Sequence, residues 1–247
     1  MRPFVMTIAG HDPSGGAGLT SDCKTFEQLK VQGLTVCTAV TVQTEDQFHS
    51  VNWVNNNLVL EQVDTLIQRY HPGVVKIGLI QSATLLQQII QQLQKQLNNT
   101  FIIWDPILSS SSGFYFHNDI QDFESTLVAV SLLTPNRIEA EKLFGSNDAR
   151  FIQDRCRDMH LQAVLLKGGH SIRNKGDDLL ITCNDIINIK GEQQHLVSDK
   201  HGTGCILSAA IAAELAKGNN LVQSCITGKR YVERIMSSNK SLLGFHS

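Results

Sequence analysis

Short apolar runs alternate with longer amphipathic segments along most of this chain, and that alternation constrains the fold more than any other feature. The apolar runs predict strands at 4–9, 35–43, 74–80, 101–105, 132–134 and 163–167, with further strands at 179–182, 186–189 and 196–198. The amphipathic segments predict helices at 17–32, 58–70, 82–97, 119–130, 136–145, 148–161, 203–217 and 220–238. Strands that are continuously rich in Val, Ile and Leu are buried on both faces, as in a parallel sheet covered by helices. We therefore predict an α/β fold, with a central, mostly parallel sheet flanked by helices on both faces, in a single domain spanning residues 1–247.

Composition and charge narrow the classes of function. Of the 247 residues, 42% are hydrophobic, and 21 Lys and Arg stand against 23 Asp and Glu, for a net charge of −2. This balance lacks the basic surplus that binds phosphate backbones, so we expect no nucleic-acid partner. No apolar run approaches the roughly 20 residues that cross a bilayer, and the first is too short for a signal peptide, so we expect a cytoplasmic protein without a membrane partner. The six cysteines include no CxxC pair, which argues against a disulfide framework or a structural zinc site.

The residue types that carry chemistry gather where the predicted strands end. In open α/β sheets, ligands bind outside the carboxyl ends of the strands. The segments at those ends are 10–18, 42–45, 78–81, 105–108, 135–139 and 168–170, and the glycine-rich turn at 202–204 joins them. We expect the functional site there.

The first segment, residues 10–18, reads Gly-His-Asp-Pro-Ser-Gly-Gly-Ala-Gly and leads from a strand into a helix. Its glycines let the backbone approach a ligand closely or take positive φ. It is not a Walker A loop, because no Lys follows its glycines, and it lacks the third glycine of a dinucleotide motif. Asp12 and Asp22 add polar groups to the same area. A tight strand-to-helix turn without a ligand is the alternative interpretation.

A second segment, residues 201–205, reads His-Gly-Thr-Gly-Cys and precedes an Ala-rich run that forms helices readily, so it lies at a helix N-terminus. Unpaired backbone N–H groups and the helix dipole make such a position an anion site, and a transferring phosphoryl group fits it. Cys205 would feel the same field, which favours the thiolate over the thiol. A buried cysteine in a helix of small residues is the alternative.

Polar side chains also lie at the carboxyl ends of two further predicted strands. Asn136 and Glu139, spaced i and i+3 at a helix start, could hold water around Mg²⁺. The same pair is the pattern of an N-cap with Glu three residues on, so both interpretations stay open. Lys167 is followed by two glycines, which are equally compatible with a simple turn.

Taken together, these segments resemble the hydroxymethylpyrimidine/phosphomethylpyrimidine kinases of thiamine biosynthesis, which belong to the ribokinase-like superfamily. The resemblance covers nearly the whole chain. It rests on motifs that follow one another in order at 9–18, 22–26, 39–44, 76–79, 105–107, 134–136, 167–170 and 201–205.

The resemblance implies an ATP- and Mg²⁺-dependent kinase that phosphorylates 4-amino-5-hydroxymethyl-2-methylpyrimidine and then the resulting monophosphate. It implies that Cys205 accepts the hydroxyl proton, with the backbone N–H groups of Gly202, Thr203 and Gly204 around the moving phosphate. It places Gln43 against the pyrimidine, where its amide offers both a donor and an acceptor. The other substrate-binding residues are then expected to be Gly10, Asp12, Ala17, Asp22, Val42, Leu79 and Ile107.

The same resemblance places the nucleotide beside Lys167, Gly168, Thr203 and Gly204, and Mg²⁺ beside Asn136, Glu139 and Asp105. Leu79 stands where the family usually has Met, and His11 stands where Ser or Thr is usual. Members are commonly dimers, so we expect a homodimer.

Two other functions stay open. A pyridoxal kinase shares the scaffold and the Gly-Thr-Gly-Cys turn, but Gln43 favours a pyrimidine substrate. A non-catalytic pyrimidine-binding module would keep the fold alone, and the presence of Cys205 and Glu139 favours an enzyme instead.

Overall fold

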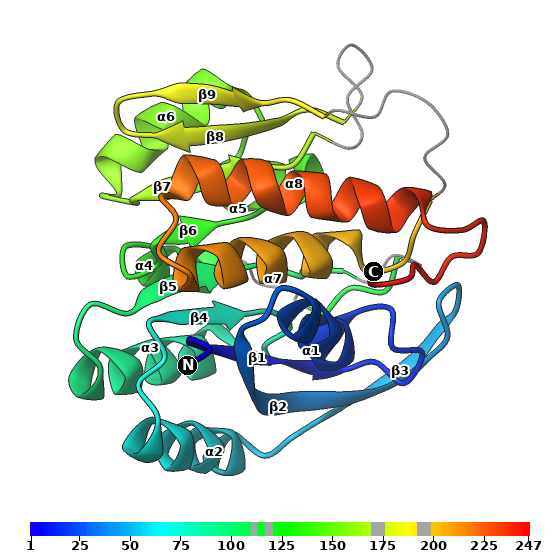
Figure 1. Cartoon of the computed structure of the whole chain (residues 1–247). Helices are drawn as coiled ribbons and strands as arrows, with labels where there is room; N and C mark the ends of the chain where they lie inside the picture. The colour runs from blue at the N-terminus through cyan, green and yellow to red at the C-terminus, as the bar shows by residue number, and fades with distance from the viewer. Residues whose placement is uncertain (110–112, 117–120, 169–175, 192–198) are drawn as a thin grey trace.

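The strands form one sheet in the computed structural model, which describes residues 1–109, 113–116, 121–168, 176–191 and 199–247. Within these residues the strand order is β3-β2-β1-β4-β5-β6-β7-β8-β9 (Figure 1). The strands are β1 (Phe4–His11), β2 (Gln32–Gln43), β3 (Phe48–Trp53), β4 (Val74–Ile77), β5 (Phe101–Trp104), β6 (Leu132–Leu133), β7 (Ala163–Leu166), β8 (Asp178–Thr182) and β9 (Ile186–Ile189).

The middle of the sheet is parallel and both edges are antiparallel. Strands β2, β1, β4, β5, β6 and β7 pair in parallel with their neighbours. Strand β3 runs antiparallel beside β2, and β8 and β9 close the other edge in the same way. The predicted mostly parallel sheet is therefore confirmed. Its strand order changes direction between β1 and β4, which is where such sheets open a crevice at their carboxyl ends.

Helices cover both faces of the sheet (Figure 1). On one face lie α1 (Gly18–Gln28), α7 (Thr203–Ala216) and α8 (Leu221–Ser237), which share a hydrophobic core with that side of the strands. The other face packs against α2 (Asn56–Arg69), α3 (Ala83–Gln96), α4 (Glu124–Leu127), α5 (Arg137–Phe144) and α6 (Ala149–Asp158). Helix α7 is buried nearly all round between the sheet, α1 and α8, which explains why its sequence is apolar on every face.

The sequence predictions need correction at few elements. Strand β3 was not predicted, because it is an edge strand of mainly half-buried and exposed residues and contains no apolar run. The helix predicted at 119–130 is a 3₁₀ turn, Gln121–Phe123, followed by the single turn α4, and residues 119–120 lie outside the described residues. The strand predicted at 196–198 also lies outside them. In the described residues, no helix is long and apolar enough to cross a membrane.

Candidate active site

A cavity of about 400 Å³ opens where the carboxyl ends of the parallel strands meet the N-termini of α1 and α7. Residues from both ends of the sequence surround it. The sequence-predicted residues in its lining are Gly10, Asp12, Ala17, Gln43, Leu79, Asp105, Ile107, Asn136, Glu139, Lys167, Gly202, Thr203, Gly204 and Cys205. The strand-end rule therefore located the cavity.

Two predicted residues lie outside this lining for reasons of backbone geometry. Val42 is 50% exposed, whereas its neighbours Thr41 and Gln43 line the cavity. Side chains of a strand alternate between its faces, so Val42 points to the opposite side and is not a substrate contact. Gly168 donates its backbone N–H to Asp178 Oδ1 at 2.8 Å and does not line this cavity, so its assignment to the nucleotide stays a prediction.

Asp22 is a second correction. Its Oδ2 accepts hydrogen bonds from Lys76 Nζ at 2.7 Å and from Thr7 Oγ1 at 2.5 Å, and the Asp22 and Lys76 side chains are both 0% exposed. Burial would lower the pKa of Lys76, but the negative groups near it, above all the carboxylate of Asp22, together outweigh burial and raise that pKa above its ordinary value. Asp22 therefore acts as the counter-charge of a buried ammonium group and does not reach the substrate.

Of the helices that begin at the cavity, α1 and α7 have no side-chain cap, whereas α5 is capped by Asn136. Side chains accept the first backbone N–H groups of α2, α3, α5, α6 and α8. In the described chain, α1 begins after Ala17 and α7 after Gly202, with no side-chain hydrogen bond at either N-cap. The N–H groups in the first turn of α7 are thus available to an anion in the cavity.

Glycines allow close backbone contacts at both of the uncapped helix ends, those of α1 and α7. Gly18 has φ of +58°, and a Cβ there would lie 2.2 Å from the carbonyl oxygen of Gly10. Gly202 has φ of +77°, and a Cβ there would lie 2.0 Å from the carbonyl oxygen of Gly16. Both positions exclude any side chain, which explains the glycine-rich sequences that flank the cavity.

Cys205 lies in the first turn of α7 and is 7% exposed. Burial raises the pKa of its thiol to about 11, and the charge of Lys76 and a hydrogen bond from the backbone of Gly18 offset this only in part. The predicted thiolate is therefore not the main form of Cys205. Desolvation outweighs the field of the helix N-terminus, and near neutral pH the group is a thiol.

Asp105, directly after β5, accepts hydrogen bonds from three side chains at the cavity. Its Oδ1 accepts from Lys167 Nζ at 2.9 Å and from Thr134 Oγ1 at 3.0 Å, and its Oδ2 accepts from Ser208 Oγ at 3.2 Å. Burial would raise the pKa of Asp105, but Lys167 and Lys76 outweigh it, and the pKa lies below its ordinary value. The cavity therefore contains a carboxylate and an ammonium group in contact.

Asn136 and Glu139 form the N-cap of α5. Asn136 Oδ1 accepts the backbone N–H of Glu139 at 2.9 Å, and Glu139 Oε2 accepts that of Asn136 at 2.7 Å. This capping box confirms the N-cap interpretation. Burial raises the pKa of Glu139, against the opposing charge of Lys167, whose Nζ lies 3.8 Å from Oε2.

The same carboxylates decide how a Mg²⁺ ion could be held. Among the described residues, no group of three or more His, Cys, Asp or Glu forms a metal cage. Asp105 and Glu139 do line the cavity, and Mg²⁺ commonly binds through one or two carboxylates, water and substrate phosphates. The oxygen donors present therefore fit a Mg²⁺ ion that is held largely through water and phosphate.

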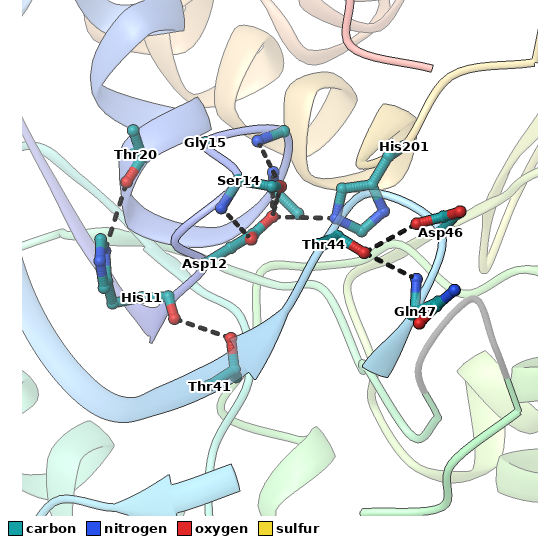
Figure 2. A network of polar contacts seen from close by, with 12 residues as sticks. His11, Asp12, Ser14, Gly15, Thr20, Thr41, Thr44, Asp46, Gln47 and His201 are labelled. Atoms are coloured by element: carbon teal, nitrogen blue, oxygen red, sulfur yellow. Dashed lines mark hydrogen bonds and ion pairs between the residues drawn. The ribbon is translucent and has the colours of Figure 1, made fainter. Parts of the chain in front are cut away.

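Asp12 and His201 join the two glycine-rich segments (Figure 2). Asp12 accepts hydrogen bonds from the backbone N–H groups of Ser14 and Ala17, both at 2.9 Å, and its Oδ2 lies 2.9 Å from His201 Nε2. The Asp12 and His201 side chains are 3% and 8% exposed. Burial would raise the pKa of Asp12, but its hydrogen bonds with His201 and Ser14 outweigh it and lower that pKa. His201 was not predicted as a site residue, although its place directly before the 202–204 turn was a usable signal.

Other cavity residues were also missed. They are Ala9, His11, Gly18, Thr41, Phe48, Ser109, Phe116, Ile138 and Lys200. His11 and Thr41 sit at predicted strand ends, where the backbone carbonyl of His11 accepts the Thr41 hydroxyl at 3.0 Å (Figure 2). Phe48 lies on the unpredicted strand β3, so no rule about predicted strand ends could include it.

Comparison with known proteins then identifies the family. The family model described as phosphomethylpyrimidine kinase matches residues 12–246. The chain belongs to this family. A hydroxymethylpyrimidine/phosphomethylpyrimidine kinase from Staphylococcus aureus (strain MRSA252) is 31% identical over 241 residues, which are 93% of this chain and 86% of that protein.

Solved structures of similar fold include kinases of two named classes. A phosphomethylpyrimidine kinase from Clostridium difficile 630 superimposes with a TM-score of 0.77 at 28% identity, over 94% of this chain and 98% of that one. A pyridoxal kinase from Staphylococcus aureus, solved with pyridoxal, gives a TM-score of 0.82 at 25% identity over 96% of this chain and 88% of that one. The same kinase has also been solved with ADP. The predicted family, ribokinase-like fold and kinase class are confirmed.

Proposed function

We propose that this phosphomethylpyrimidine kinase family member transfers the γ-phosphate of ATP to the hydroxymethyl group of 4-amino-5-hydroxymethyl-2-methylpyrimidine. It then phosphorylates the monophosphate to the diphosphate, for thiamine biosynthesis. The observation that carries the proposal is that Gln43 and the 202–205 turn line one cavity. The amide of Gln43 suits an aminopyrimidine edge, and the turn suits a phosphate, so one bound ring can present its hydroxymethyl group to the phosphate donor.

The uncapped N-terminus of α7 supports a role in phosphate binding. Its backbone N–H groups at Thr203, Gly204 and Cys205 are oriented by the helix and have no side-chain cap. Lys167 adds a positive charge from the carboxyl end of β7, because the carboxylates of Asp105 and Glu139 raise its pKa against the opposing effect of burial. Phosphoryl transfer depends mainly on positioning and charge stabilisation, which these groups supply.

Mg²⁺ is part of the proposal. Asp105 and Glu139 would hold it through water and phosphate oxygens, and when bound it neutralises part of the negative charge of the ATP phosphates. Asn136 contributes through the capping box that fixes the position of Glu139.

Cys205 is proposed as the proton acceptor of the first transfer, because the hydroxyl group must lose its proton as it attacks. Because the pKa of this thiol is about 11, only its small thiolate fraction can accept the proton, and the charge of Lys76 increases that fraction. The second transfer needs no such base, because its acceptor is a phosphate oxygen with a second pKa of about 6.

The test is ATP turnover by the purified protein with hydroxymethylpyrimidine, its monophosphate or pyridoxal as sole acceptor. We expect faster turnover with both pyrimidines than with pyridoxal. Gln43→Leu should abolish most pyrimidine turnover, whereas Val42→Ala, at the neighbouring position that faces away from the cavity, should retain it. ATP that stays intact with every acceptor would refute the kinase and favour a binding module.

The likeness to the pyridoxal kinase from Staphylococcus aureus favours a second candidate function, phosphorylation of pyridoxal. Pyridoxal is also a small heteroaromatic ring with a hydroxymethyl group. Turnover with pyridoxal alone would assign the chain to vitamin B6 salvage.

We further propose that residues 1–247 act as one domain, in the cytoplasm and as a homodimer. The homodimer rests on the family resemblance. Light scattering by the purified protein tests it, and a monomeric mass at working concentration would refute it.

A further inference from the structure

Two aromatic side chains outside the family motifs line the cavity, Phe48 on β3 and Phe116. Their ring centroids lie 5.3 Å apart with an interplanar angle of 86°, an edge-to-face contact. Phe114 packs behind Phe48 at 4.9 Å, and Trp53 lies 6.5 Å from Phe116. We call Phe48 and Phe116 the aromatic wall. It joins the β2–β3 hairpin to the 113–116 segment.

The aromatic wall stands beside the residue proposed to bind the pyrimidine. Gln43 and Phe48 are cross-strand partners at a register shift of the β2–β3 hairpin, and both line the cavity. Because both side chains line one cavity, the amide and the phenyl ring can contact one ligand. An amide meets a heteroaromatic ring at its polar edge, whereas a phenyl ring covers an apolar face.

We propose that the aromatic wall selects flat heteroaromatic acceptors by packing against the ring face, while Gln43 distinguishes a pyrimidine from a pyridine. The proposal rests on the function proposed above and divides its specificity between two groups. Stacking is insensitive to ring nitrogens, because every heteroaromatic ring has a π-face. The wall should therefore favour hydroxymethylpyrimidine and pyridoxal equally.

The test measures the Kd of each compound separately by titration calorimetry, with Phe48→Leu and Phe116→Leu. Leucine keeps apolar volume and removes the ring, so the loss reports the aromatic contact. We expect each variant to weaken both compounds about three- to tenfold and by the same factor, the effect of one aromatic pair. Gln43→Leu should weaken the pyrimidine more than pyridoxal, and the KM for ATP should stay constant in the wall variants.

Two further variants control the experiment. Phe151→Leu changes a 45% exposed phenylalanine on α6 that does not line the cavity, and should bind as wild type does. Phe48→Tyr keeps the ring and should retain affinity. This result would show that the losses in the leucine variants come from removal of the ring and not from a general effect on folding. Wild-type affinity in both leucine variants, or a loss confined to one compound, would overturn this inference alone. Wild-type protein that binds neither compound would overturn the proposed function as well.

Discussion

Raising the pH is expected to accelerate the first phosphoryl transfer and to leave the second nearly unchanged. Burial raises the pKa of the Cys205 thiol to about 11, so near pH 7 about one molecule in 10⁴ carries the thiolate. If the thiolate accepts the hydroxyl proton, the first rate follows its population and rises about tenfold per pH unit, or about 100-fold between pH 7 and 9. The phosphate that accepts the second transfer is already ionised over most of this range, because its second pKa is about 6.

The assay is a single-turnover measurement with each acceptor across this pH range at saturating ATP and Mg²⁺. Cys205→Ser preserves the size of the side chain but introduces a hydroxyl that does not ionise, so the first transfer should lose both its rate and its pH slope. The second transfer should persist in this variant. Cys225→Ser serves as the control, since Cys225 is also buried but lies on α8 outside the cavity. The role of the thiolate would be refuted if the rate of the first transfer in the wild type did not change with pH, or if Cys205→Ser kept the wild-type rate.

Three further predictions concern stability and are checked by urea unfolding. Lys76→Met leaves Asp22 as an uncompensated buried charge and should lower the free energy of unfolding by about 3–5 kcal/mol, most of which Asp22→Asn in the same chain should restore. Gly202→Ala places a Cβ at positive φ against the carbonyl oxygen of Gly16 and should destabilise by at least about 1–3 kcal/mol, whereas a cost near zero would show that the turn can relax. Burial lowers the pKa of His246 to about 4 from 6.5, so the unfolded chain binds the proton more readily, and the stability that the neutral ring contributes is lost as the pH falls from 6.5 toward 4. His246→Phe should therefore unfold with a smaller pH dependence than the wild type over that range.

The alternation of apolar and amphipathic segments predicted the place of the site. It does so because ligands of open α/β sheets bind at the carboxyl ends of the strands, a rule that depends on topology alone. Gln43 and Asp105 follow different strands in the sequence, and a parallel sheet necessarily brings their carboxyl ends to one edge. The misassignment of Val42 was avoidable, since the period of two along a strand separates it from Gln43. Phe48 could not be predicted as a site residue, because an edge strand without an apolar run has no signal in hydrophobic periodicity.

Charge states could not be predicted from local sequence, because they depend on groups that the fold brings together. The helix N-terminus before Cys205 is visible in the sequence and favours a thiolate, yet burial dominates its pKa. Among the groups that oppose burial, the largest effect comes from Lys76, and the carboxylates of Asp105 and Asp22 act in the contrary direction. Asp22 therefore does two things at once: it keeps Lys76 charged in a fully buried position, and it weakens the influence of that charge on the thiol. The motif residues at 22 and 76 thus influence the pKa of the Cys205 thiol through electrostatics, although neither lines the cavity.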